Sequence, residues 1–149
     1  MTVTVEQILN GARKWINFKE GKNNDNPFGK HFKANNVAYC AYFISYVLIV
    51  ECKMNILPCG YVPTLYNYYK GKGKIYSQPK AGDLVFFDFV KDGISEHIGF
   101  VEQVLPNGKI ITIEANTSST HKGSQDNGDG VFRKERYISS CLGFGRIVP

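Results

Sequence analysis

A cysteine and a histidine in this 149-residue chain have the surroundings that amide cleavage by a thiol requires. Cys40 stands near the start of an apolar run, 37–50, and His97 precedes an apolar run in which Gly99 leaves space on the same side. A thiol attacks an amide carbonyl only as the thiolate, so it needs a neighbouring base and a setting that favours negative charge. Imidazole is the usual base and can pass its proton to the leaving amine. The two residues predict covalent amide hydrolysis if the fold brings them together.

Two polar residues in the segment 113–116, Glu114 and Asn116, could hold the imidazole ring. Both alternate with apolar residues, so both are expected on one face of a strand. The Pro-Asn-Gly sequence at 106–108 is typical of a hairpin turn, which would bring this segment to the same end of a strand pair as His97. The result would be the nucleophile, base and orienting group of a cysteine hydrolase.

Helical spacing or helix-start signals occur in three segments: 4–19, 38–52 and 63–69. Thr4 and Gln7 predict a capping box at the first helix, and Gly21 is expected to end it. The stretch 22–36 is rich in Asn, Gly and Lys and is expected to be a loop.

Cys40 falls in the first turn of the second predicted helix. Unpaired backbone N–H groups and the helix dipole favour negative charge there by about 0.3–1 kcal/mol. The same N–H groups can form one wall of an oxyanion hole. This position would assist a thiolate and the intermediate that it forms.

Short runs rich in Val, Ile and Phe follow the helices and are separated by Gly, Asn and Asp: 84–90, 98–105, 109–115, 130–137 and 143–148. Helices first and antiparallel strands afterwards predict an α+β fold with a sheet of about five strands. The length and a hydrophobic content of 43% fit one domain over residues 1–149. We expect the four cysteines to be free thiols, buried at Cys52, Cys59 and Cys141, because a chain with such a core has little need of disulfides and the spacing is poor for zinc.

The net charge of +5 permits attraction to anionic polymers but does not select one. The densest basic group, Lys70, Lys72 and Lys74, lies among glycines and tyrosines, and no nucleic-acid module is recognisable, so we expect no nucleic-acid partner. The start of the chain lacks the features of a signal peptide, and the run 37–50 is shorter than a membrane span, so we expect no membrane insertion.

Four motifs resemble those of CHAP domains, the cysteine- and histidine-dependent amidohydrolases and peptidases. The cysteine block is VAYCAYFISYV at 37–47, and PKAGDLVFF at 79–87 is similar to the family's Gly-Asp-Leu strand. EHIGFV at 96–101 resembles the histidine block, and IEAN at 113–116 resembles the acid and asparagine block. The motifs occur in the family's order, and the resemblance covers roughly residues 15–148.

The resemblance implies a papain-like fold, related to that of NlpC/P60 domains, in which N-terminal helices pack on an antiparallel sheet. It makes Cys40 the nucleophile, His97 the general base and then acid, Glu114 the orienting group and Asn116 a supporting residue. It also implies cleavage of cell-wall peptidoglycan, at the muramoyl-L-alanine bond or within the peptide, without a cofactor. Many such domains belong to phage endolysins, which are made in the host cytoplasm without a signal peptide and reach the wall after release.

Two departures from the family pattern concern the neighbourhood of the cysteine. Tyr39 stands where tryptophan is common, which we expect to change packing more than chemistry. Asn35, Asn36 and Tyr42 occupy positions where some endolysin domains carry calcium-binding aspartates, so no metal site is expected there. The stretch 23–26 is also interpreted as a solvated loop, and 126–130 as a turn.

Three alternatives remain open at the level of sequence. An NlpC/P60 hydrolase usually has Asp before and Ser-Gly after the cysteine, which Tyr39 and Ala41 do not match. A non-catalytic wall-binding or structural module could share the fold, and nucleic-acid binding has only charge to support it. Tyr61, Tyr66 and Phe28 are candidates for a substrate groove, with core packing as the competing role. The bond cleaved, the target species, the oligomeric state and any wall-binding domain after Pro149 are not predicted.

Overall fold

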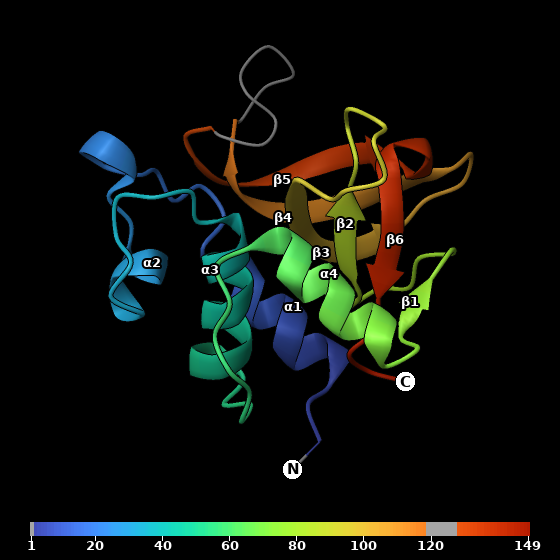
Figure 1. Cartoon of the computed structure of the whole chain (residues 1–149), viewed down its shortest axis with the longest axis horizontal. Coiled ribbons are helices and arrows are strands. Elements are labelled where there is room, and N and C mark those ends of the chain that lie inside the picture. Colours follow the sequence, from blue (N-terminus) through green and yellow to red (C-terminus); the bar gives the residue numbers. More distant parts are fainter. Residues whose placement is uncertain (1, 119–127) are drawn as a thin grey trace.

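The computed structural model describes residues 2–118 and 128–149, which form helices and one six-stranded antiparallel sheet (Figure 1). The strand order is β1-β6-β2-β3-β4-β5. The helices are α1 (Val5–Arg13), α2 (Pro27–His31), α3 (Cys40–Tyr46) and α4 (Val62–Gly71). The strands are β1 (Ile75–Tyr76), β2 (Leu84–Phe87), β3 (His97–Val104), β4 (Lys109–Thr117), β5 (Gly130–Tyr137) and β6 (Cys141–Gly145). The α+β prediction is confirmed, with six strands where about five were expected.

Helix α1 begins as predicted and ends earlier. The Thr4 side chain accepts from the Gln7 backbone N–H at 3.1 Å, and the Gln7 side chain accepts from the Thr4 backbone at 2.9 Å. The helix ends at Arg13, well before Gly21. Asn17 has a φ of 76°, and its N–H donates to the Val131 carbonyl of β5 at 2.8 Å. Pairing with the sheet replaces the last predicted helical turn.

The stretch 22–36, predicted as an ordered or semi-ordered loop, also contains short helical segments. It contains a short 3-10 turn (Lys22–Asn24) and α2. The Asn26 side chain caps α2 by accepting from the Gly29 N–H at 2.8 Å, and Pro27 is the first helical residue. An Asn N-cap followed by proline is a helix-start signal, which the composition of the stretch obscured.

Helix α3 continues directly into a wider π-helical segment, Val47–Glu51. The two segments together match the predicted helix 38–52, and Cys40 lies in the first turn as expected. Helix α4 is about one turn longer than predicted. None of the helices within 2–118 and 128–149 is both long enough and apolar enough to cross a membrane.

The five predicted strands are present, 130–137 with the predicted ends and the other four with shifted ends, and β1 was missed. Two residues carry too short a pattern to predict a strand, and β1 exists because Ile75 and Tyr76 pair with β6. The turn between β3 and β4 is confirmed: Asn107 and Gly108 have φ values of 65° and 71°, and the Leu105 N–H donates to the Lys109 carbonyl at 2.9 Å. This hairpin and an irregularity of β3 between Val101 and Gln103 together set the register that positions the candidate site.

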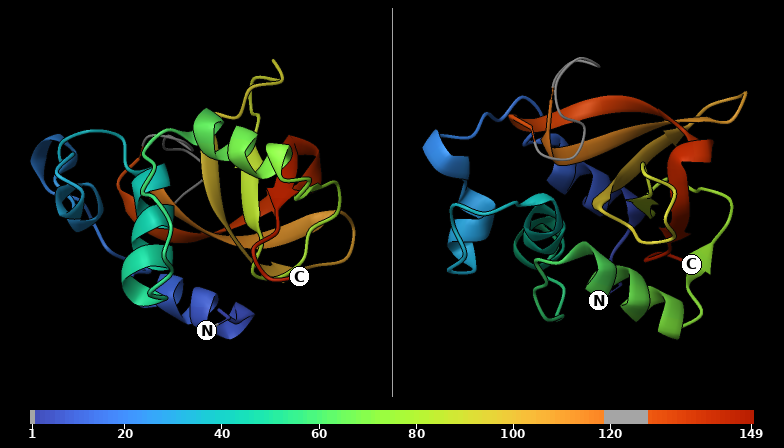
Figure 2. Two further views of the ribbon diagram at one scale, coloured as in Figure 1. Left: turned by 60° about the horizontal axis from the view of Figure 1, so that its bottom comes forward. Right: turned by 45° about the horizontal axis from the view of Figure 1, so that its top comes forward.

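The two faces of the sheet bury different sets of side chains. Because side chains alternate along a strand, Leu84 and Phe86 join the core beneath α1, α3 and α4, whereas Val85 and Phe87 belong to a smaller cluster on the other face. The views in Figure 2 show these helices against one side of the curved sheet. The smaller cluster adjoins several fully buried polar residues.

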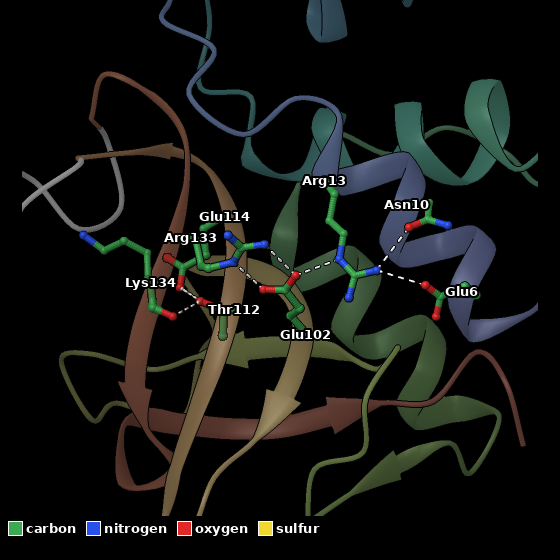
Figure 3. A network of polar contacts seen from close by, with 8 residues as sticks. All are labelled: Glu6, Asn10, Arg13, Glu102, Thr112, Glu114, Arg133 and Lys134. Atoms are coloured by element: carbon green, nitrogen blue, oxygen red, sulfur yellow. Dashed lines mark hydrogen bonds and ion pairs between the residues drawn. The ribbon is translucent and has the colours of Figure 1, made fainter.

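A charged contact links α1 to the sheet. Glu102 of β3 accepts from Arg13 Nε at 2.7 Å and from Arg133 of β5 at 2.5 and 2.8 Å. Arg13 also contacts Glu6 and Asn10 on its own helix (Figure 3). The two arginines hold the pKa of Glu102 below its ordinary value, chiefly through the hydrogen bond from Arg133.

Candidate active site

Cys40 is the first residue of α3 and is 7% exposed. No side-chain hydrogen bond caps the helix at Tyr39. The helix packs across β3 and β4, which places its first turn against the strands that carry the predicted base and acid. The position predicted from sequence, a cysteine at the N-terminus of a buried helix, is present.

His97 opens β3 and is completely buried. Its Nε2 lies 2.9 Å from Oε1 of Glu114, and its ring stacks on Phe87 and Phe89 at centroid distances of 5.6 and 6.1 Å. Within the described residues, its Nδ1 has no hydrogen-bond partner in good geometry. Because Nε2 is bonded to Glu114, Nδ1 is the ring atom that remains for the Cys40 sulfur.

Opposing influences act on the protonation of His97. Burial is the largest and lowers the pKa, but hydrogen bonding and charge from Cys40 and Glu114 outweigh it and raise the pKa to about 9. The imidazolium is therefore favoured at neutral pH when a thiolate and a carboxylate flank the ring. Such an ion pair is the arrangement in which a cysteine is nucleophilic without a separate deprotonation step.

Glu114 is also completely buried, on β4. Besides His97, it accepts hydrogen bonds from Arg136 Nε at 2.8 Å, Arg136 Nη2 at 2.5 Å and Thr112 Oγ1 at 2.5 Å. Burial raises its pKa, but the hydrogen bonds and charges of Arg136 and His97 outweigh that effect and lower the pKa to about 2. The carboxylate is thus ionised over the whole working range of an enzyme.

Arg136 and Thr112 were missed in the sequence. Arg136 belongs to β5, where Phe132, Lys134 and Arg136 alternate with exposed residues. That alternation was the available signal, but arginine is seldom fully buried, so Arg136 was not singled out.

Gly99 has a different role from the predicted one. It pairs with Glu114 across the hairpin, and a Cβ at this position would lie 2.7 Å from the Glu114 Cγ and 3.0 Å from the Ile113 carbonyl oxygen. The space beside His97 is therefore filled by the carboxylate side chain. Glycine is required for the close approach between the strands.

Asn116 is buried two residues beyond Glu114, at an irregularity of β4 where its φ is 59°. Its backbone hydrogen-bonds to the Tyr39 hydroxyl, which in turn donates to Glu20 Oε1 at 2.8 Å. Burial is the main reason that the pKa of Tyr39 is raised. Tyr39, the residue before Cys40, is thus fixed to β4. This contact is a packing role, the kind of role expected for a tyrosine at this position.

The other predicted residues lie outside this cluster. Cys52, Cys59 and Cys141 are free thiols, as predicted, but only partly buried. Phe28 is fully buried in the core, so it is not a groove residue, and Tyr66 packs edge-on against Phe86. Tyr61 is 66% exposed.

Two acidic groups bear on metal binding. Asp25 in the 23–26 stretch is paired with Lys30 at 3.3 Å and bonded to Asn35 at 2.7 Å, and the 126–130 turn lies partly outside the described residues. Oxygens of Asp88, Asp92 and Glu96 approach within 4.8 Å of one another. Each of the three carboxylates accepts hydrogen bonds from backbone N–H groups of the β2–β3 loop. We therefore interpret these residues as stabilising the conformation of the loop.

The CHAP domain family model matches residues 32–116, more than half of the chain. The matched range contains Cys40, His97, Glu114 and Asn116. The chain therefore belongs to the CHAP domain family. No curated protein sequence matches it.

Solved structures show the same fold at low sequence identity. The crystal structure of Ly7917 is 12% identical, with a TM-score of 0.55 over 95% of this chain and 61% of that one. Ly7917 with the hydrolyzing product of MDP gives 13% identity and a TM-score of 0.54 over the same shares. An N-acetylmuramoyl-L-alanine amidase from Staphylococcus aureus is 16% identical over 71% of this chain and 30% of that one, with a TM-score of 0.47. The chain spans about three fifths of the length of Ly7917, and the first two likenesses establish the fold.

Proposed function

We propose that this chain is a peptidoglycan hydrolase that cleaves an amide bond of the bacterial cell wall with Cys40 as nucleophile. The observation that carries the proposal is the buried pair of His97 and Glu114, joined at 2.9 Å beside the first turn of α3. Membership of the CHAP family supports the chemistry, and Ly7917, which shares the fold, has also been solved with the hydrolyzing product of MDP. Either the muramoyl-L-alanine bond or a bond within the stem peptide fits this mechanism.

The reaction has two halves. The Cys40 thiolate adds to the amide carbonyl carbon, and backbone N–H groups at the start of α3 stabilise the oxyanion. The His97 imidazolium gives its proton to the amine nitrogen, the C–N bond breaks, and the acyl group remains as a thioester. Neutral His97 then takes a proton from water, the hydroxide adds to the thioester, and Cys40 leaves as thiolate beside a renewed imidazolium.

Glu114 serves the base in both halves. Its bond to Nε2 fixes the ring with Nδ1 directed to the sulfur, and its charge stabilises the imidazolium. Asn116 is proposed as a supporting residue that acts through Tyr39 and the position of Cys40. No step in this scheme requires a metal or a cofactor.

Turbidity loss of purified Gram-positive walls tests the proposal. We expect clearing by the wild type, loss of clearing by at least about 10³-fold in Cys40→Ala, and full activity in Cys52→Ala, a matched change at a partly buried free thiol. Mass spectrometry of the fragments separates a new L-alanine N-terminus from new termini within the peptide. Equal clearing by wild type and Cys40→Ala would refute the role of Cys40. Wall binding without clearing would favour the non-catalytic module.

A role in phage lysis is part of the proposal and rests on the family resemblance. The test is expression inside a susceptible bacterium with and without a membrane pore protein. Lysis that needs both proteins supports release to the wall by that route, and lysis by the chain alone excludes it.

A further inference from the structure

Arg136 binds Glu114 from the strand opposite His97. Two of its nitrogens contact the two carboxylate oxygens, at 2.8 and 2.5 Å. The Arg136 side chain is 9% exposed and that of Glu114 is fully buried. A planar guanidinium that meets a carboxylate with two bonds fixes both its charge and its orientation.

The same two aromatic rings hold both partners of Glu114. The Arg136 guanidinium lies 5.1 Å from the ring centres of Phe87 and Phe89, which also stack on the His97 ring. Phe87 belongs to β2, and Phe89 lies in the loop that leads to His97. The base, the carboxylate and the arginine therefore form one packed unit.

A fully buried carboxylate without a cation would take up a proton, because burial penalises its charged form. Burial is the largest influence on Glu114 and acts to raise its pKa, and Arg136 is the first influence that opposes it. A protonated Glu114 would place no negative charge beside Nε2 of His97. The imidazolium would then lose the carboxylate charge that stabilises it on that side. The charge that stabilises His97 thus depends on a residue that does not touch it.

We propose that Arg136 is a positioning residue that keeps Glu114 ionised and directed at Nε2 of His97, and thereby maintains the imidazolium that faces Cys40. The hydrolysis of peptidoglycan enters only as the reaction that this ion pair would serve. The ion pair itself can be measured without any wall substrate.

Other ionisable groups near Glu114 do not replace Arg136. The Lys134 ammonium, two residues earlier on β5, donates to the Ser118 carbonyl at 2.7 Å, and burial lowers its pKa. The charges of Glu114 and Arg136 also act on Cys141 of β6. Burial raises the pKa of its thiol to about 12, so the thiol stays neutral. Among the described residues, the other charged or titratable groups that act on His97 and Cys141 are Cys40 and Lys91, respectively.

The test is the alkylation rate of Cys40 by iodoacetamide as a function of pH, read at the Cys40 peptide by mass spectrometry. Alkylation follows the thiolate, which persists at low pH only beside an imidazolium. In Arg136→Gln we expect the pH midpoint of alkylation to rise by about one unit, which is roughly a tenfold lower rate at pH values below it. In Arg136→Lys, which keeps the charge and loses the two-pronged contact, we expect a smaller rise.

Arg133→Gln is the matched control. Arg133 lies three residues away on β5 and also binds a carboxylate, that of Glu102 (Figure 3). This pair lies on the other face of the sheet, and the Arg133 side chain is half exposed. We expect its alkylation midpoint to equal that of the wild type.

Folding is checked by thermal unfolding of each variant. An Arg136→Gln protein that folds and keeps the wild-type midpoint overturns the proposal, whatever its wall activity. If Arg136→Gln does not fold, Arg136→Lys decides, and a wild-type midpoint there overturns it equally. A Glu114→Gln background sharpens the test, because adding Arg136→Gln should not move the midpoint further if the arginine acts through Glu114. Failure of wall clearing with a normal Cys40 midpoint would instead count against the proposed function alone.

Discussion

Strand β5 carries two arginines that each bind a carboxylate from a neighbouring strand, in opposite settings. Arg133 binds Glu102 at the edge of α1 with half of its side chain in water, whereas Arg136 binds Glu114 in a site with almost no access to water. Exposed ion pairs contribute little because solvent screens them, and buried pairs become costly when one partner is lost. We therefore expect the same pair of residue types to be dispensable on one face of the sheet and to contribute strongly to stability on the other.

Glu114→Ala should give the largest effect and tests the buried side of the comparison. It leaves the Arg136 guanidinium and the His97 ring buried without their carboxylate, so we expect a loss of about 3–5 kcal/mol in the free energy of unfolding. Wall clearing should fall at least about 100-fold. Urea unfolding and turbidity assays measure the two quantities. A loss below 1 kcal/mol, the size expected for an exposed pair, would remove the distinction between the two faces.

The pH dependence of stability should also distinguish the two pairs. The pKa of His97 rises from 6.5 unfolded to about 9 folded, so its contribution is complete below about pH 6.5 and is lost as the pH rises through 9. The pKa of Glu114 falls from 4.5 to about 2, so its contribution is present above about pH 4.5 and is lost as the pH falls towards 2.

We therefore expect the free energy of unfolding to be greatest between about pH 4.5 and 6.5 and to fall by roughly 3 kcal/mol on the alkaline side. Urea unfolding at a series of pH values measures it, with Glu102→Gln as the control that should keep this alkaline loss. A flat profile between pH 6.5 and 9 would contradict the raised pKa of His97.

Gly99→Ala tests how tightly the buried pair is packed. The added methyl group would meet the Glu114 Cγ at 2.7 Å and the backbone of β4, so either the carboxylate or the strand must move. Overpacking of this kind costs about 1–3 kcal/mol. We expect clearing to fall together with stability, and Gly108→Ala, at a turn with open space around it, is the contrast for a purely conformational cost. Unchanged activity in Gly99→Ala would show that Glu114 tolerates displacement.

Glu102→Ala should have the smallest effect. Both arginines that it releases can reach water, so we expect a loss of about 1 kcal/mol or less, reduced further at high salt. Wall clearing should stay within twofold of the wild type, in keeping with a contact that links α1 to the sheet (Figure 3). A loss as large as that of Glu114→Ala would show that this network matters for folding despite the exposure of its two arginines.

Local signals in the sequence were sufficient for much of this protein. The capping box at Thr4, the Pro-Asn-Gly turn at 106–108 and the cysteine at the start of a buried run each depend on neighbours within a few residues. The hairpin then brings Glu114 near His97, but a bulge between Val101 and Gln103 shifts the register by one residue and so pairs Glu114 with Gly99. The sequence did not predict this bulge. The fold class and the membership of the CHAP family were accessible for the same reason.

Contacts between distant segments decided the rest. Helix α1 ends early because Asn17 pairs with Val131 of β5, and β1 exists only through its pairing with β6. In the sequence, Arg136 is one of several charged residues that alternate along a strand. Only the assembled fold shows that its side chain is buried. The sequence by itself determined which residues could do chemistry and the order of the elements that carry them. Only the tertiary structure decided which charged side chains are buried, because alternation along a strand separates its two faces but does not say which face the rest of the protein covers.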